Sequence, residues 1–270
     1  MFRSKDAIIE EFHRIKDEGW IPSVKRKGND AGPGNTLEEL LGIEENNLPI
    51  PNAGEWELKA QRRGSQSLVT LFHCEPSPRA VRYVPQILLP LYGWKHKKAG
   101  EKYPDDEMSF RSTTYANRYT DRGFRIIMND DDRKIEFSFN ANQSNDRHGE
   151  WLSSVEERVG NLADLNPRPY WGYDDIYAKA RSKIYNTFFS LCNHKIEENR
   201  EFFHFNEFYE LSEFTQNKFL NCVREGLIAV DFDARTGHNH GTKFRMQSNA
   251  FPELFERVRS IFPQRLEGYF

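Results

Sequence analysis

The sequence lacks the long apolar segments of membrane proteins and the paired cysteines typical of proteins in oxidising compartments. It contains no apolar stretch near the roughly 18 residues that a membrane span requires. Residues 1–6 lack the apolar run of a signal peptide. The cysteines are odd in number, lie far apart and form no zinc pattern. We therefore expect a cytoplasmic protein with no membrane partner, in which Cys74, Cys192 and Cys222 are buried free thiols.

An excess of positive charge is also absent. The formal net charge is −3 and the sequence pI is near 6.3, which excludes a protein that coats DNA through overall basicity. A local positive cleft can still exist on an acidic surface. The composition that is present, with 37% hydrophobic and 14% aromatic residues, predicts a globular protein. A length of 270 residues accommodates one large domain or two closely joined lobes.

The segment from Asn52 to Lys59, Asn-Ala-Gly-Glu-Trp-Glu-Leu-Lys, is the most informative in the chain. Residues 55–61 alternate between polar and apolar, which predicts a strand with Glu55, Glu57 and Lys59 on one face. An acid and an amine two residues apart on one face lie within about 7 Å of each other. That spacing suits a carboxylate that holds a divalent cation beside a lysine that positions or activates water. Taken alone, the same pattern is more often ordinary alternation on a half-exposed strand.

Periodicity and cap residues predict the other elements. Ser4 is expected to cap a helix that ends near Gly19, and Thr36 with Glu39 has the form of a capping box for a helix ending near residue 46. Further helices are expected at 174–192, at 212–225 and from Pro252, with a short or kinked one in 79–91. Further strands are expected at 67–75, 123–128, 134–139, 227–232 and 242–247. This order predicts a mixed α/β (α+β) protein with two lobes.

Five segments, in this order along the chain, resemble the MvaI/BcnI family of restriction endonucleases, which is related to the MutH mismatch-repair nickase. They are residues 19–22 (Gly-Trp-Ile-Pro), 34–43, 54–62, 70–72 (Thr-Leu-Phe) and 237–245 (Gly-His-Asn-His-Gly-Thr-Lys-Phe-Arg). The resemblance implies a PD-(D/E)xK nuclease, in which a restriction-endonuclease-like mixed sheet is flanked by helices and two lobes surround a DNA cleft. Within a single nuclease spanning 1–270, we expect the catalytic lobe mainly in 1–150 and the DNA-recognition lobe mainly in 165–270.

The resemblance also implies an activity and a set of active-site residues. The implied protein is a prokaryotic, monomeric type II restriction endonuclease that hydrolyses double-stranded DNA at a short GC-rich site of CC-x-GG type, with CCWGG favoured. By position, Asn52 and Glu57 are the metal-binding residues, Lys59 is the catalytic lysine and Glu38 is an auxiliary catalytic acid. The implied cofactor is Mg²⁺, which takes only one or two carboxylates from a protein and keeps several waters.

Asn52 departs from the family pattern, which has Asp at this position. An amide oxygen can touch Mg²⁺ but carries no net charge, so we expect weaker cation binding and cleavage slowed by orders of magnitude. Three explanations stay open: an Asp→Asn variant made to hold DNA uncut, which we favour; a natural sequence that tolerates Asn; or replacement of the lost ligand by Glu55. The sequence is also compatible with a longer parent chain that has been trimmed.

The loop 237–241 has two histidines at i and i+2 with no cysteine nearby, which makes a weak metal site. The resemblance implies instead that this loop enters a DNA groove, where arginine pairs well with guanine. The residues that would read bases are His238, His240, Arg235, Lys243 and Arg245. The residues that would contact phosphates are Lys25, Arg26, Arg62 and Arg63. The alternatives are a polar hairpin held by its two glycines and ordinary solvated charge.

Two other functions stand beside the restriction endonuclease. One is a MutH-like strand-nicking repair endonuclease recruited by a partner, which the Gly-His-Asn-His-Gly loop disfavours. The other is a sequence-specific DNA-binding module that does not cut because Asn52 is native. Such a module would bind DNA tightly and without regard to metal.

Overall fold

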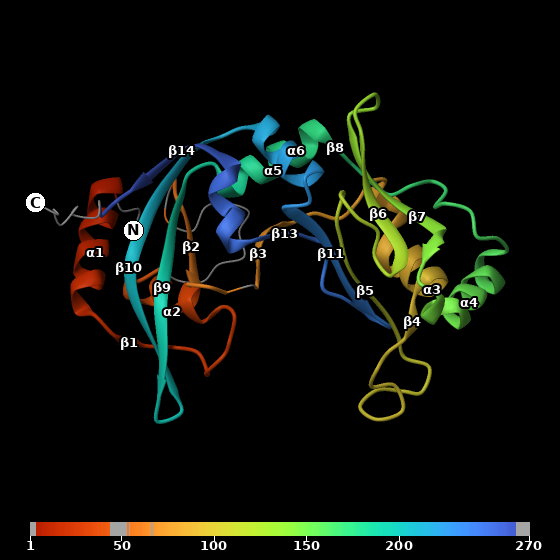
Figure 1. The fold of residues 1–270 in the computed structure, drawn as a ribbon, viewed down its shortest axis with the longest axis horizontal. Helices are drawn as coiled ribbons and strands as arrows, with labels where there is room; N and C mark the ends of the chain where they lie inside the picture. The colour runs from red at the N-terminus through yellow and green to blue at the C-terminus, as the bar shows by residue number, and fades with distance from the viewer. Residues whose placement is uncertain (1–3, 44–52, 54, 66, 263–270) are drawn as a thin grey trace, which may run out of the picture. The chain divides into compact units, whose positions relative to one another are not determined.

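The computed structural model describes residues 4–43, 53, 55–65 and 67–262. The chain divides into two compact units, and each is assembled from separate stretches (Figure 1). Unit 1 comprises residues 1–67, 180–218 and 248–270, and unit 2 comprises residues 68–179 and 219–247. The lobes expected at 1–150 and 165–270 do not coincide with these units. The reason is that strands after residue 187 pair with segments from the first 62 residues.

Unit 1 is built around one mixed sheet. Its elements are α1 (Lys5–Glu18), β1 (Ile21–Pro22), α2 (Gly32–Leu40), β2 (Glu57–Arg62), β9 (Thr187–Glu197), β10 (Arg200–Phe214), η4 (Ser248–Leu254) and β14 (Phe255–Ser260). The strand order is β1-β10-β9-β2, and β14 pairs with β10. β2 runs parallel to β9, whereas the other pairs are antiparallel. The predicted mixed sheet flanked by helices is thus confirmed.

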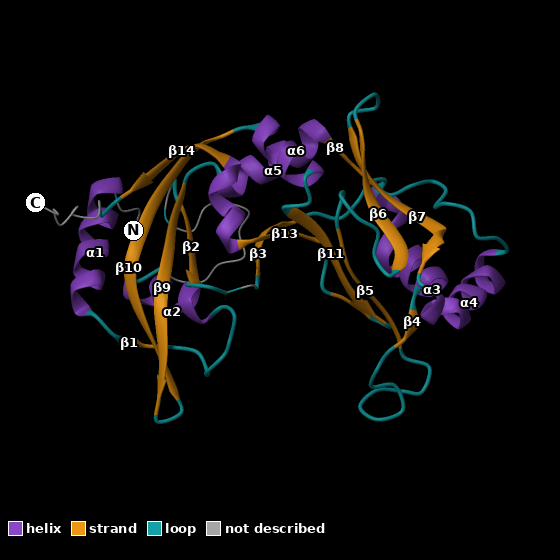
Figure 2. Ribbon diagram, viewed as in Figure 1, coloured by secondary structure: helices purple, strands orange, loops and turns teal. Residues whose placement is uncertain are grey.

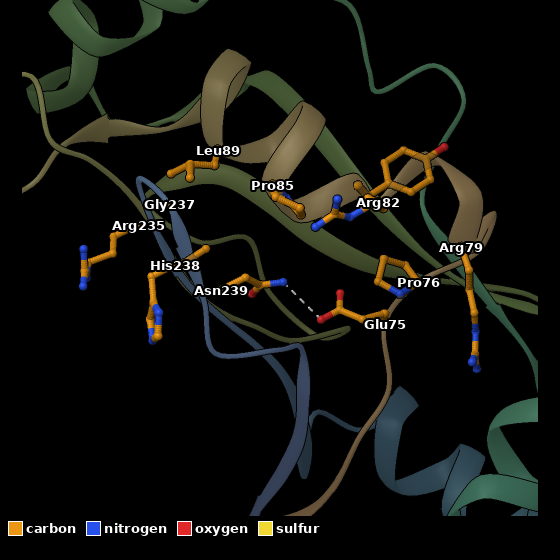
Figure 3. Close-up of a pocket in the computed structure, with 12 residues that line it drawn as sticks. Glu75, Pro76, Arg79, Arg82, Pro85, Leu89, Arg235, Gly237, His238 and Asn239 are labelled. Atoms are coloured by element: carbon orange, nitrogen blue, oxygen red, sulfur yellow. Dashed lines mark hydrogen bonds between the residues drawn. The ribbon is translucent and has the colours of Figure 1, made fainter.

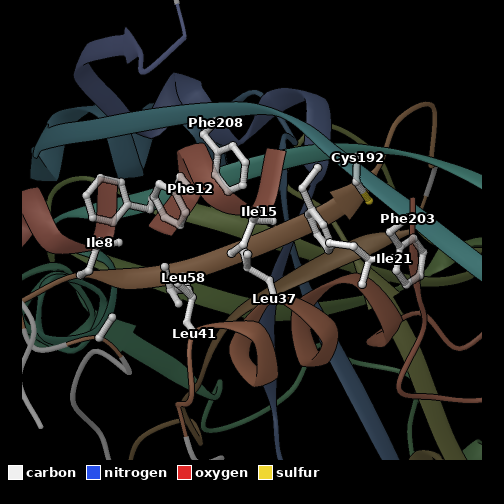
Figure 4. Close-up of a cluster of buried hydrophobic side chains, with 13 residues drawn as sticks. Ile8, Phe12, Ile15, Ile21, Leu37, Leu41, Leu58, Cys192, Phe203 and Phe208 are labelled. Atoms are coloured by element: carbon white, nitrogen blue, oxygen red, sulfur yellow. The ribbon is translucent and has the colours of Figure 1, made fainter. Parts of the chain in front are cut away.

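The core of unit 1 lies where α1 and α2 meet this sheet (Figure 4). α1 forms as predicted, because the Ser4 side chain accepts a hydrogen bond from the Ala7 amide at 3.3 Å and Gly19 ends the helix with φ +77°. Its apolar face includes Phe12, whose ring stacks on Phe208 with the centroids 4.2 Å apart. Leu58 of β2 belongs to the same buried cluster. The apolar side of β2 is therefore anchored in the core.

Unit 2 contains two antiparallel sheets (Figure 2). Its elements are β3 (Leu68–His73), η1 (Arg79–Val81), η2 (Val84–Leu88), α3 (Leu89–Tyr92), β4 (Trp94–Lys95), β5 (Met108–Thr114), β6 (Arg122–Asn129), β7 (Lys134–Ser144), η3 (Asp146–His148), α4 (Gly149–Val159), β8 (Tyr170–Gly172), β11 (Ile228–Arg235), β12 (His238–Asn239) and β13 (Lys243–Gln247). One sheet has the order β3-β13-β11-β5-β4 with β12 beside β11, and the other is β6-β7-β8. Two of the boundaries between the units in the sequence fall within the helices α5 (Tyr173–Ile184) and α6 (Gln216–Arg224).

Several predicted elements are wrong in kind or in extent. Thr36 does not cap α2 but lies inside it, where its hydroxyl donates to the Gly32 carbonyl at 2.8 Å. The helix expected at 174–192 ends at Ile184, and the residues from Thr187 onward form β9. The helix expected from Pro252 is the short 3₁₀ segment η4 followed by β14. α6 starts after the end of β10 rather than at 212.

The three cysteines are buried and free, as predicted. Burial raises the pKa of the Cys192 thiol to about 12, so this group stays protonated near neutral pH. In the parts of the chain that the structure describes, no helix has the length and apolarity needed to cross a membrane.

Candidate active site

Glu57 and Lys59 meet on one face of β2, as the alternation predicts. The Glu57 side chain is only 2% exposed, and the Lys59 ammonium donates a hydrogen bond to its Oε1. The backbone of β2 is fixed at this point, because the Glu57 amide donates to the Asn186 carbonyl at 2.9 Å and Lys59 pairs in register with Phe189 of β9. The acid and the amine are therefore held together by a rigid strand.

A second amine at this carboxylate, Lys183, was not expected from the sequence. It lies in the last turn of α5, and its Nζ is 3.5 Å from Oε2 of Glu57. A buried carboxylate requires charged or hydrogen-bonding partners, and the two lysines supply them from different elements. No local signal marks Lys183, because only the tertiary fold brings the end of α5 to β2.

The other residues predicted for the catalytic centre are not in the Glu57–Lys59 pair on β2. Asn52 lies outside the described residues. Glu38 is half-buried in α2, a helix that packs against β2. Glu55 is exposed in a turn before β2, so the expectation that it shares a strand face with Glu57 is wrong. The strand begins two residues later because Trp56 first closes a tight bridge with Ala53.

The donor atoms at this site are carboxylate oxygens, which suit a hard cation such as Mg²⁺ better than a softer metal. Glu57 offers a buried carboxylate, and Mg²⁺ takes only one or two carboxylates while keeping several waters. Within residues 4–43, 53, 55–65 and 67–262, no three His, Cys, Asp or Glu side chains gather into a metal-binding group. The buried Glu57 carboxylate thus fits a cation of this kind.

Arg62, expected to contact DNA phosphates, is engaged inside unit 1. Its guanidinium donates to both carboxylate oxygens of Glu201, at 2.6 and 2.9 Å, and to the Asn29 carbonyl at 2.8 Å. Glu201 also accepts from the Gly28 amide at 3.0 Å. The hydrogen bonds from Arg62 hold the pKa of this carboxyl below its usual range. This pair fastens the glycine-rich loop to the end of β2, and the DNA contact of Arg62 stays a prediction.

The remaining basic candidates of unit 1 lie at its surface. Lys25 and Arg26 are exposed in the loop that the Arg62–Glu201 pair fastens. Arg63 is half-exposed and forms an ion pair with Glu207.

In unit 2, one face of the sheet β5-β11-β13 is charged and the other is buried and mostly apolar. The charged face consists of Arg111, Thr113, Asp231, Asp233, Lys243 and Arg245, which the strand register places side by side. Asp231 accepts from Thr113 at 2.7 Å and from Arg245 at 3.1 Å. Asp233 lies 2.8 Å from Arg111 and 3.8 Å from Lys243. The sequence analysis missed the two aspartates, although their alternation with the apolar residues Val230, Phe232 and Ala234 is the signal that marks them.

The histidine loop forms a short hairpin against the end of β11. His238 and His240 are exposed, and their rings meet edge to face with the centroids 4.3 Å apart. Arg235 is bound to Glu107 at 3.0 Å and lies over the Tyr103 ring at 4.8 Å. The two histidines therefore project into solvent, whereas the predicted reader Arg235 is held by its own unit.

Comparison with known proteins agrees with this architecture. The family model of the MvaI/BcnI restriction endonuclease family matches residues 9–255. The structure is similar to the restriction endonuclease MvaI in complex with its cognate DNA substrate, with TM-score 0.74 and 23% identity over 96% of this chain and 100% of that chain. It is also similar to MvaI in the absence of DNA, with TM-score 0.56 and 22% identity over 96% of this chain and 99% of that one. The chain matches no curated protein. Because the family model spans nearly all of its length, the chain belongs to the MvaI/BcnI restriction endonuclease family, a family of DNA-cleaving hydrolases.

Proposed function

We propose that this chain is a monomeric type II restriction endonuclease that hydrolyses phosphodiester bonds of double-stranded DNA at a CC-x-GG site, with CCWGG favoured and Mg²⁺ as cofactor. The observation that carries the proposal is the buried Glu57 carboxylate on β2 with Lys59 at one oxygen and Lys183 at the other. Unit 1 would carry the chemistry and unit 2 the recognition of the bases. That MvaI was solved with its cognate DNA supports duplex DNA as the partner.

Glu57 would hold the cation together with the residue at position 52. When bound, Mg²⁺ lowers the pKa of its water and offsets charge on the phosphate. The Lys59 ammonium lies at the carboxylate, so it is also in reach of a phosphate oxygen that approaches Glu57. Hydrolysis adds negative charge to that phosphate, and a fixed cation stabilises it there without reorganising. Lys183 and Lys59 together keep the Glu57 carboxylate oriented. Glu38 remains an auxiliary acid in this proposal.

Position 52 decides how fast this chain cuts. We favour an Asp→Asn change that leaves DNA binding intact and slows cleavage by orders of magnitude, since an amide brings no charge to a hard cation. Glu55 is less suited to replace the lost ligand, because it lies in an exposed turn before the strand. Asn52 also favours the second candidate function, a DNA-binding module that never cuts.

In unit 2, the charged face and the histidine hairpin have the chemistry to read a GC-rich site. An arginine such as Arg245 pairs with guanine O6 and N7, and a carboxylate such as Asp231 accepts from cytosine N4. The two side chains are already paired with each other, which fixes their orientation. His238 and His240 would add contacts from the hairpin, and Lys25, Arg26 and Arg63 of unit 1 would contact phosphates.

Site-specific cleavage tests this proposal. With Mg²⁺, the Asn52→Asp variant is expected to nick and then linearise a plasmid that carries CC-x-GG sites. It should leave intact a matched plasmid in which those sites are altered, and EDTA should stop the reaction. Cleavage of both plasmids at the same rate would contradict a sequence-specific enzyme. Tight, metal-independent binding with no cleavage by either form would favour the non-cutting module.

A further inference from the structure

A cavity of about 530 Å³ opens in unit 2 beside the histidine hairpin (Figure 3). One side is formed by the segment around η1 and η2, including Arg79, Arg82 and Pro85, and the other by the hairpin residues His238 and Asn239. The lining is rich in cations and has one acid, Glu75. Arg79 and Arg82 are not among the DNA-contacting residues predicted from the sequence.

The acid in this cavity is already engaged. Glu75 accepts from the Thr242 amide and hydroxyl, both at 3.0 Å, and from the Asn239 side chain at 3.3 Å. Asn239 in turn accepts from the Gly241 amide at 3.0 Å. Glu75 thus fixes the hairpin, and its carboxylate is directed to hairpin donors rather than to the arginines across the cavity (Figure 3).

Two arginines of the cavity are left with little to neutralise them. The Arg82 side chain makes no hydrogen bond or ion pair with any residue that the structure describes, and the side-chain contact described for Arg79 is a long one, 3.9 Å to the Cys74 sulfur. Arg82 also has φ +49°, a left-handed conformation that residues with a side chain seldom adopt. A third arginine of the lining, Arg235, is satisfied by Glu107.

We propose that this cavity receives the DNA backbone, with Arg79 and Arg82 each holding one phosphate group. The guanidinium fork matches phosphate geometry, and charge-assisted bonds of this kind are among the strong ones. His238 lines the same cavity, so a phosphate bound here would set the register of the hairpin on the duplex. This inference rests on the proposed function, because it assumes that unit 2 binds duplex DNA.

The salt dependence of binding tests the proposal. Each neutralised phosphate contributes a slope of about −0.9 to log K against log salt concentration on duplex DNA. The double variant Arg79→Gln/Arg82→Gln should therefore flatten this slope by about 2. The slope is measured by fluorescence anisotropy with EDTA between about 50 and 200 mM NaCl, a range over which phosphate contacts lose much of their affinity. Affinity should fall equally for a CC-x-GG duplex and for a scrambled duplex, because a phosphate contact carries no sequence information.

Two further variants keep the test decisive. Arg82→Gly removes the side chain at a position whose backbone suits glycine, so it should fold normally and flatten the slope by about 1. Arg147→Gln removes an exposed arginine of η3 that does not line the cavity, and it should change nothing. An unchanged slope in the double variant, or a loss confined to the CC-x-GG duplex, would overturn the phosphate site while leaving the proposed function in place. Failure of the unsubstituted chain to bind either duplex would overturn both.

Discussion

Replacing Lys59 by Met is expected to slow DNA cleavage by about 10²- to 10³-fold, the usual effect of removing one fixed group that stabilises developing charge. The reason is geometric, because β2 holds this ammonium at the Glu57 carboxylate, where the reacting phosphate would approach. The measurement is single-turnover cleavage in the Asn52→Asp background, where we expect the rate to be high enough to follow. Binding of uncut duplex should change far less than the rate.

The chain offers a matched control for this variant. Lys195 and Glu197 form the same i,i+2 pair on β9, 2.8 Å apart, but the acid is 57% exposed. Lys195→Met should therefore cut at the rate of its parent. A Lys59→Met enzyme that cuts as fast as its parent would remove Lys59 from the catalytic centre.

Replacing Glu201 by Gln should lower the free energy of unfolding by about 3–5 kcal/mol, the usual effect of breaking a buried ion pair by removing one partner. Both partners are nearly buried, with Arg62 11% and Glu201 2% exposed, and the substitution leaves the guanidinium charge unmatched. Urea denaturation at neutral pH measures the change. The exposed Glu197→Gln serves as the control, and it should alter stability by no more than about 1 kcal/mol.

The same pair makes a prediction about pH. Because Arg62 lowers the pKa of Glu201 in the folded state, the ionised carboxylate stabilises the fold. That contribution is fully present above the unfolded pKa of about 4.3 and is lost as the pH falls through the lower folded value. The stability difference between the unsubstituted chain and Glu201→Gln should therefore shrink below about pH 4. A difference that does not shrink on acidification would show that the ion pair is not its source.

Helix caps and short alternating patterns in the sequence correctly predicted several helices and strands. Ser4 and Gly19 bracket α1, and the alternation of polar and apolar residues marks the strands β6, β7, β11 and β13. β9 was mistaken for helix because Phe188 and Phe189 are both buried, so this central strand shows no period of two. The capping-box form at Thr36 misled because Gly32 and Pro33 start α2 one turn earlier.

In the candidate site, too, contacts between sequence neighbours could be predicted, whereas contacts between distant residues could not. Glu57 and Lys59 are neighbours on one strand, so the spacing of two residues was enough to pair them. Arg62 and Glu201 are 139 residues apart, and Lys183 reaches Glu57 only through the packing of α5, so no sequence pattern could join them. A basic residue in a sequence is also ambiguous between a DNA contact and an internal ion pair. Arg62 and Arg235 proved to be internally paired, and only the fold shows it.

Mg²⁺-dependent cleavage of a plasmid bearing CC-x-GG sites, with this chain compared directly with Asn52→Asp, tests the nuclease function and its metal site together. We expect the Asp form to nick and then linearise the plasmid, while the Asn form binds it and cuts slower by orders of magnitude. Equal rates for the two forms would contradict a metal ligand at position 52. Absence of cleavage by both forms, on this plasmid and on any other sequence tried, would contradict the nuclease function itself.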